Sequence, residues 1–162
     1  MLFRSIVIQS GTSLLGNTQT GEYDKGRLIS MVEVAKHHGL LSKEHNGDYI
    51  QSSVIKQKFS FGLDAINIAP EFGLIETNTY LNEIRNTDMF DKFWKICFES
   101  DRWKKWVDEK FNPYEQKEEL IKICGHYVLS TDEFYNDVKI NLPNIDNLII
   151  KNIKIKLNDL YE

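Results

Sequence analysis

An α/β fold is predicted for this chain of 162 residues, with parallel strands and helices alternating through its first half. Three predicted strands, at residues 5–9, 40–44 and 65–69, are separated by two stretches with helical patterns, and the second of them starts with the short apolar run Gly39-Leu40-Leu41. Strands that alternate with helices in this way form βαβ units and a parallel sheet. From residue 88 onward the strand patterns fade and aromatic-rich helical patterns follow. We therefore predict two parts: residues 1–87, and a helical extension of residues 88–162 that packs on the first part.

The first predicted unit begins with a strand at residues 5–9, which are rich in β-branched side chains. A polar loop follows, and Asp24 is a suitable N-cap for the next helix. That helix has apolar residues at the spacing of an amphipathic face, and Gly39 suits the position just after its end. The pattern predicts a helix whose apolar face packs on the sheet, through Leu28, Ile29, Val32 and Ala35.

The next elements repeat this alternation. A second strand is predicted at residues 40–44, and Ser52 or Ser53 could cap a short helix after it. A third strand is predicted at residues 65–69, followed by a helix over about residues 74–85. The crossovers are expected to be right-handed. In the tail we predict helices at residues 89–107, 115–124 and 145–160, with a further helix starting near residue 131.

Three parallel strands with two crossovers are only part of a fold, since a (β/α)₈ barrel takes about 250 residues. An apolar strand that starts at residue 5 with nothing before it would leave a bare sheet edge, which natural proteins cover or blunt. We therefore predict the C-terminal part of a TIM barrel with an appended helical tail. The other half would come from another chain, from self-association, or be absent.

Composition narrows the class of protein. The chain is 41% hydrophobic and 27% charged, with a formal net charge of −4, which is typical of a soluble globular domain and not of a nucleic-acid-binding protein with its basic face. No apolar stretch reaches about 18 residues, so no membrane span is predicted. The first residues are too short for a signal peptide, and two cysteines are too few for a disulfide framework, which predicts a cytoplasmic protein. Cys97 and Cys124 lack metal spacing and are expected to be buried free thiols, and Trp94, Trp103 and Trp106 to pack between helices.

Polar residues gather where each predicted strand ends. The segment Glu44-His45-Asn46-Gly47-Asp48-Tyr49 follows the second strand. The first strand ends in Gln9-Ser10-Gly11-Thr12, and the third in Asn67 with Pro70-Glu71-Phe72-Gly73. Active sites of parallel α/β folds gather at the carboxyl ends of strands. We therefore expect these three clusters to lie side by side and to form one site.

The residue types at these ends predict a ligand. Acceptors, neutral donors and an imidazole that titrates near neutral pH together suit a polyhydroxylated molecule such as a sugar phosphate. Gly11, Gly47 and Gly73 would let backbone N–H groups approach phosphate oxygens. The candidate catalytic residues are Glu44, His45, Asp48 and Glu71. The candidate substrate-binding residues are Gln9, Thr12, Asn46, Tyr49, Asn67 and, closing over the site from the tail, His126.

Each of these residues also has a structural interpretation. An imidazole can be a satisfied packing residue, and a carboxylate can cap a turn or a helix or pair with a lysine. These alternatives apply to His45 and His126, to Asp48 before Tyr49, to Glu71 in a first helical turn, and to Glu44 beside Lys43. A divalent metal is a further alternative, because His45 with Glu44 or Asp48 offers suitable ligands. No spacing signature supports a metal, so no metal ligands are assigned and the cofactor stays unknown.

These same segments resemble the C-terminal half of the tagatose-bisphosphate aldolase non-catalytic subunit family. The resemblance rests on Ile8-Gln9-Ser10-Gly11-Thr12, on Lys43 to Tyr49, and on Ile66 to Gly73. In that family a strand ending near Q-x-G is followed by an E-x-H-x-x-D-Y type segment and a later strand end of K-V-G-P-A-L-T type. The similarity covers about residues 5–85, and the best matches are His45, Asp48, Tyr49 and Pro70.

The resemblance implies a TIM barrel related to class II aldolases, sugar-phosphate catabolism, and a separate zinc-dependent catalytic subunit as partner. Two departures bear on activity. No residue separates Glu44 from His45, and Glu71 stands where the family has a neutral residue. An added carboxylate favours an enzyme of aldolase or isomerase type on sugar phosphates. The alternatives are a stabilising or interaction subunit without chemistry, and a truncated remnant of such a barrel.

Overall fold

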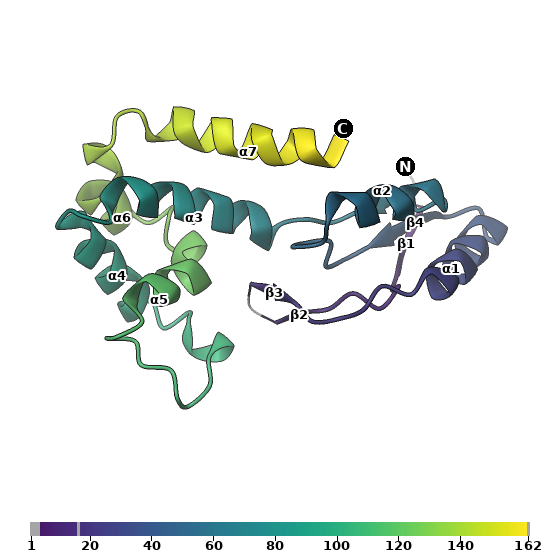
Figure 1. Ribbon diagram of the computed structural model, residues 1–162, viewed down its shortest axis with the longest axis horizontal. Coiled ribbons are helices and arrows are strands. Elements are labelled where there is room, and N and C mark those ends of the chain that lie inside the picture. Colours follow the sequence, from purple (N-terminus) through teal and green to yellow (C-terminus); the bar gives the residue numbers. More distant parts are fainter. Residues whose placement is uncertain (1–3, 16, 162) are drawn as a thin grey trace. The chain divides into compact units, whose positions relative to one another are not determined.

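The computed structural model describes residues 4–15 and 17–161, which fall into two compact units (Figure 1). The first unit runs to Glu71 and takes in the chain from Asp159 onward, and the second is Phe72–Asn158. The boundary between the two units follows residue 71, whereas the sequence predicts the boundary between its two parts at residue 88, where strand patterns give way to helical ones. Gly16, in the predicted polar loop, lies outside the described residues.

The first unit is built on a small parallel sheet in the order β1-β4-β5. Its strands are β1 (Ser5–Ile8), β4 (Leu41–Glu44) and β5 (Ala65–Ile66). Ser5 pairs with Leu41 and Ile8 with Glu44, and Glu44 in turn pairs with Ile66. The predicted α/β class with three parallel strands is therefore confirmed, and the carboxyl ends of all three strands lie at one edge.

Helix α1 (Lys25–His37) packs on β1 and β4, as its apolar spacing predicts. The Asp24 side chain accepts a hydrogen bond from the Arg27 backbone N at 2.9 Å, which confirms the predicted N-cap. Gly39 follows the helix with φ of 64°, a left-handed conformation that glycine adopts at low cost. A compact core joins the helix to the sheet through Ile8, Leu28, Val32 and Leu63.

Several boundaries differ from the predicted ones. The third strand has only two residues, because the chain turns toward helix α3 (Pro70–Ile84), which begins four residues earlier than expected. Proline at position 70 suits the first turn of a helix, where its missing N–H is not needed. Helix α2 (Ser52–Ser60) has Gln51 at its N-cap, without a side-chain hydrogen bond, in place of Ser52 or Ser53. A short hairpin of β2 (Leu14–Leu15) and β3 (Thr18–Gln19) forms within the predicted loop.

The second unit is helical, as predicted for the tail. It contains most of α3, then α4 (Met89–Glu99), α5 (Lys117–Cys124), α6 (Asp132–Asp137) and most of α7 (Ile145–Tyr161). Three short 3₁₀ helices connect them: η1 (Lys104–Trp106), η2 (Gly125–Tyr127) and η3 (Lys139–Asn141). Its core centres on an aromatic trio, Tyr80, Phe93 and Phe134, with ring centroids 4.8–6.4 Å apart.

The cysteines and two tryptophans take the structural roles predicted for them. Cys97 and Cys124 are buried free thiols, and burial raises the pKa of Cys97 well above its usual range. Trp103 is buried in the core, and Trp94 packs against it. Within residues 4–15 and 17–161, no helix combines the length and apolar composition that crossing a bilayer requires.

Candidate functional site

Glu44 ends β4 with its carboxylate completely buried. Its Oε1 accepts hydrogen bonds from the Ser10 backbone N at 2.7 Å, from the Ser10 hydroxyl, and from the Thr12 hydroxyl at 3.4 Å. Its Oε2 accepts from Lys58 Nζ at 2.7 Å. A buried carboxylate needs such saturation, because an unpaired charge in the interior is costly. Both oxygens are therefore engaged in tying β4 to the end of β1 and to α2.

Lys58 is the counter-ion of Glu44, not the neighbouring Lys43. Successive strand residues face opposite sides of a sheet, so Lys43 points away from the carboxylate. Lys58 is fully buried, donates also to Ser10 Oγ at 3.1 Å, and lies 4.9 Å from the centre of the Tyr23 ring. Lys58 is not among the site residues predicted from the sequence. Its place on the buried face of α2, three residues after Ile55, is the feature that could have identified it.

Asp48 caps helix α3 from the preceding loop. Its Oδ1 accepts from the Ala69 backbone N at 2.8 Å and the Glu71 backbone N at 2.9 Å. In return, Glu71 Oε2 accepts from the Tyr49 backbone N at 2.8 Å. This reciprocal arrangement is that of a capping box, here made between segments more than twenty residues apart. The positive end of α3 thus already receives a carboxylate.

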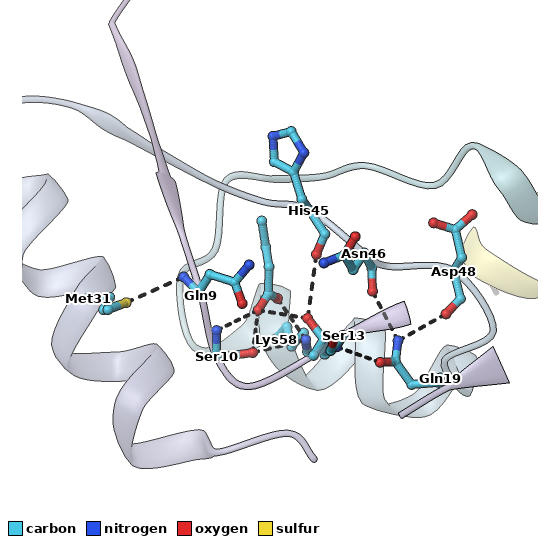
Figure 2. A network of polar contacts seen from close by, with 11 residues as sticks. Gln9, Ser10, Ser13, Gln19, Met31, His45, Asn46, Asp48 and Lys58 are labelled. Atoms are coloured by element: carbon cyan, nitrogen blue, oxygen red, sulfur yellow. Dashed lines mark hydrogen bonds and ion pairs between the residues drawn. The ribbon is translucent and has the colours of Figure 1, made fainter. Parts of the chain in front are cut away.

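The loop between β4 and α2 contains two strained residues. Asn46 and Tyr49 have φ of 60° and 59°, a left-handed conformation that is uncommon outside glycine. Gln19 holds this loop by donating from Nε2 to the backbone oxygens of Asn46 and Asp48, both at 3.1 Å (Figure 2). Strain of this kind persists where surrounding structure enforces it, often at binding sites.

The Tyr49 hydroxyl lies 3.4 Å from Asn17 Oδ1. Burial, with a smaller contribution from the carboxylates of Asp48 and Glu71, raises the pKa of Tyr49 to about 12. The phenol therefore stays protonated at neutral pH and can donate a hydrogen bond. Thr12 is buried and directs its hydroxyl to Glu44 and to the His45 backbone oxygen, so it supports the loop.

The three glycines predicted to approach a phosphate, Gly11, Gly47 and Gly73, permit close packing of the chain instead. A Cβ on Gly11, whose φ is 104°, would lie 2.1 Å from the Glu22 backbone oxygen. A Cβ on Gly47 would lie 2.6 Å from the Ile66 side chain. Gly73 lies within α3, where a Cβ would come 2.9 Å from His126 Cβ. Each glycine thus makes room for protein atoms, which accounts for it without a phosphate.

Four predicted site residues keep their side chains available for a ligand: Gln9, His45, Asn46 and Asn67. None of these side chains forms a hydrogen bond with another residue in the part of the chain that the structure describes. They follow the ends of three adjacent parallel strands. Figure 2 shows the His45 ring pointing away from Ser10 and Lys58. This is the group of uncommitted donors and acceptors at the carboxyl edge of the sheet.

His126 belongs to the second unit and packs over Gly73 of α3. Its Nδ1 is buried, and no residue within 4–15 and 17–161 forms a hydrogen bond with it. Burial lowers the pKa of His126, and the positive charge of Lys105 lowers it further. The imidazole is therefore neutral near pH 7. That His126 closes over the strand-end site stays a prediction.

Across the described residues, no group of three histidine, cysteine, aspartate or glutamate side chains has the arrangement of a metal site. Comparison of the chain with protein-family models and with curated proteins gave no match. The resemblance of residues 5–85 to an aldolase subunit family is thus an expectation that rests on the sequence segments alone.

Proposed function

We propose that this chain binds a sugar phosphate at the carboxyl ends of β1, β4 and β5, as part of a TIM-barrel-type protein of carbohydrate metabolism. The observation that supports this most is the group of uncommitted side chains at that edge: Gln9, His45 and Asn67 follow three neighbouring parallel strands. Sugar hydroxyls both donate and accept hydrogen bonds, and amide and imidazole side chains can offer both functions. Ligands of open parallel sheets bind outside these strand ends.

Binding is favoured over catalysis because the carboxylates already have structural partners. Glu44 is saturated by Lys58 and Ser10, and Asp48 caps α3. Glu71 accepts from the Tyr49 backbone. General acid–base chemistry needs a group within reach of the substrate, and His45 is the remaining candidate. An aldolase- or isomerase-type reaction would therefore depend on His45.

The phosphate group of the proposed ligand rests on the family resemblance of residues 5–85. The structure argues against holding it at the N-terminus of α3, which Asp48 occupies. The test must therefore separate the sugar from the phosphate. Calorimetry would compare fructose 6-phosphate and fructose 1,6-bisphosphate with fructose and with inorganic phosphate. We expect the phosphorylated ketoses to bind most tightly.

His45→Ala is the decisive variant. It should weaken binding of the phosphorylated ketose about tenfold or more, which is about 1.4 kcal/mol or more. His37→Ala, which removes an exposed imidazole on α1, is the matched control and should leave the affinity unchanged. Absence of binding to either ketose phosphate, or equal affinity in wild type and His45→Ala, would contradict the proposal.

A stabilising or interaction subunit without chemistry is the second candidate, and the exposed strand β1 favours it. β1 lies at the edge of the sheet, with Ile6 42% and Val7 54% exposed. Adjacent strand residues face opposite sides, so both faces of β1 have uncovered apolar surface. Parallel sheets are normally covered on both faces. Further barrel strands, from a catalytic aldolase subunit or a second copy, would cover this edge.

Light scattering over a range of concentrations tests the second candidate. We expect the chain to self-associate, and Val7→Lys to shift it to the monomer by placing a charge on the edge strand. Val34→Lys is the matched control, because Val34 is 57% exposed on helix α1. A wild-type chain that is monomeric at every concentration and unfolds cooperatively would count against both self-association and a truncated remnant.

A further inference from the structure

The two faces of the parallel sheet in the first unit have different surroundings. Ile8 and Glu44 are paired on one face, where Ile8 packs against α1 and Glu44 binds Lys58 of α2. Successive strand residues point to opposite faces, so Val7 and Lys43 are paired on the other face, and Val7 is 54% exposed there. We call this second face the open face, and its strand residues are Ser5, Val7, Leu41, Lys43 and Ala65.

Lys43 is the one charged residue among the five strand residues of the open face. It is half-buried on β4, the central strand, with Val7 and Ala65 as its paired neighbours. A charge on an edge strand discourages unwanted pairing, but a central strand has no free edge to protect. No carboxylate within residues 4–15 and 17–161 forms an ion pair with Lys43. Its ammonium group is therefore without a negative partner in that part of the chain.

The polar side chains of the strand-end site continue the open face. Gln9, His45 and Asn67 each stand two positions after a strand residue of that face, so continued alternation directs them to the same side. The hydrogen-bonded ladder reaches Asn67, whose backbone N donates to the last residue of β4 at 2.9 Å. Figure 2 shows the His45 ring pointing away from Lys58, which lies on the opposite face. Strand residues two apart are about 6.6 Å apart, a distance that the flexible side chain of Lys43 can bridge.

The ammonium group of Lys43 needs an anion once the open face is covered. Parallel sheets are normally covered on both faces. In the TIM-barrel-type protein of the proposed function the helices form the outer ring, so the open face would point into the barrel. A charge taken out of water is costly unless it is paired. Since the strand residues of this face supply no carboxylate, a ligand anion is the group that would pair with Lys43.

We propose that Lys43 binds the phosphate of the ligand, an inference that rests on the proposed function and assigns its charged contact. The ammonium group donates charge-assisted hydrogen bonds to the phosphate oxygens. His45, Gln9 and Asn67, farther along the same face, contact the sugar hydroxyls. The phosphate thus lies over β4 and not at the N-terminus of α3, which the Asp48 carboxylate already caps.

Calorimetry with fructose 6-phosphate and with fructose tests this assignment, because the two ligands differ only in the phosphate. Lys43→Gln should weaken binding of fructose 6-phosphate about tenfold or more and leave the affinity for fructose unchanged. Lys43→Arg keeps the charge and should bind fructose 6-phosphate within about threefold of wild type. Lys56→Gln, at an exposed position of α2, removes the same charge elsewhere in the first unit and is the matched control, with no effect expected.

Failure of this inference and failure of the proposed function give different results. If His45→Ala weakens binding of fructose 6-phosphate while Lys43→Gln binds it as wild type does, the site exists but Lys43 does not hold the phosphate. If Lys43→Gln weakens fructose and fructose 6-phosphate equally, its effect is structural and the assignment is overturned. If neither fructose 6-phosphate nor fructose 1,6-bisphosphate binds the wild-type chain at millimolar concentration, the proposed function fails, and this inference fails with it.

Discussion

Lys58 Nζ lies 2.7 Å from Glu44 Oε2, with both side chains fully buried. Removing either partner leaves the other charge buried without compensation, which costs about 3–5 kcal/mol in proteins. We therefore expect Lys58→Met and Glu44→Gln each to lower the free energy of unfolding by about that amount. Urea denaturation followed by circular dichroism would measure it.

The double variant Glu44→Gln/Lys58→Met is the informative control. Because it removes both charges together, its cost should be clearly smaller than the sum of the two single costs. Lys92→Met breaks an exposed pair in which Nζ lies 3.1 Å from Asp88 Oδ2, and should change stability by less than about 1 kcal/mol. Additive single costs would show that the two buried groups are energetically independent.

The local features of the first unit could be predicted from the sequence. The three strands and their helices follow from hydrophobic spacing, and Asp24 and Gly39 cap α1 by rules that involve only nearby residues. The partner of Glu44 could not be predicted in the same way. Lys43 is next to it in the chain, but strand alternation puts that lysine on the other face, and the partner is fourteen residues away.

The three polar clusters lie at one edge of the sheet, as the strand pattern predicts, but the contacts of their carboxylates could not be predicted. Residue type alone does not show whether a carboxylate at a strand end meets a ligand or a backbone N–H. The backbone N–H groups that donate to Asp48 belong to Ala69 and Glu71. They lie more than twenty residues after Asp48 in the sequence, whereas the capping rules apply to residues within one helical turn. The third strand was predicted too long because apolar residues continue to Ala69, while Pro70 already begins α3.

Asp48→Ala should destabilise the start of α3. Loss of a capping side chain costs about 0.5–2 kcal/mol. We expect a lower free energy of unfolding and faster hydrogen exchange of the Glu71 amide, which donates to Asp48 at 2.9 Å. Asp24→Ala is the matched control, and should speed exchange at Arg27 of α1 while leaving Glu71 unchanged. Unaltered exchange at Glu71 in Asp48→Ala would show that this carboxylate is not the effective cap.

Glu118 should contribute to the loss of stability in acid. The Arg85 guanidinium hydrogen-bonds to it, and together with Lys122 lowers the pKa of Glu118 from 4.5 to about 2. A lowered folded-state pKa stabilises the protein above the unfolded-state value, and this contribution is lost as the pH falls from 4.5 toward 2. Since Arg85 is 47% exposed and Glu118 33%, screening limits the effect to less than about 1 kcal/mol.

Measuring the free energy of unfolding against pH checks this. Glu118→Gln should be less stable than wild type near neutral pH, and the difference should shrink in acid and at high salt. Glu115→Gln, at an exposed position three residues earlier, is the control and should follow the wild-type curve. A Glu118→Gln deficit of the same size at every pH would exclude the ion pair as its cause.

Gly73→Ala should destabilise the second unit, even though alanine favours helices. The added Cβ would lie 2.9 Å from His126 Cβ, and such overpacking costs about 1–3 kcal/mol. Gly26→Ala in α1 is the matched control: its Cβ would lie 3.4 Å from the Asp24 carboxylate, so it should stabilise by about 0.5–1 kcal/mol through helix propensity. Thermal unfolding would compare the two variants.

A double-mutant cycle identifies the atom responsible. His126→Gly removes the Cβ that the methyl group added at position 73 would meet, so the cost of Gly73→Ala should largely disappear in that background. His126→Ala keeps the same Cβ and should leave most of the cost in place. If both backgrounds relieve Gly73→Ala equally, the clash would lie with the imidazole ring, whose Cγ and Cδ2 are 3.2 and 3.6 Å from the added atom. If neither relieves it, the close approach of α3 to His126 is not the cause of the destabilisation.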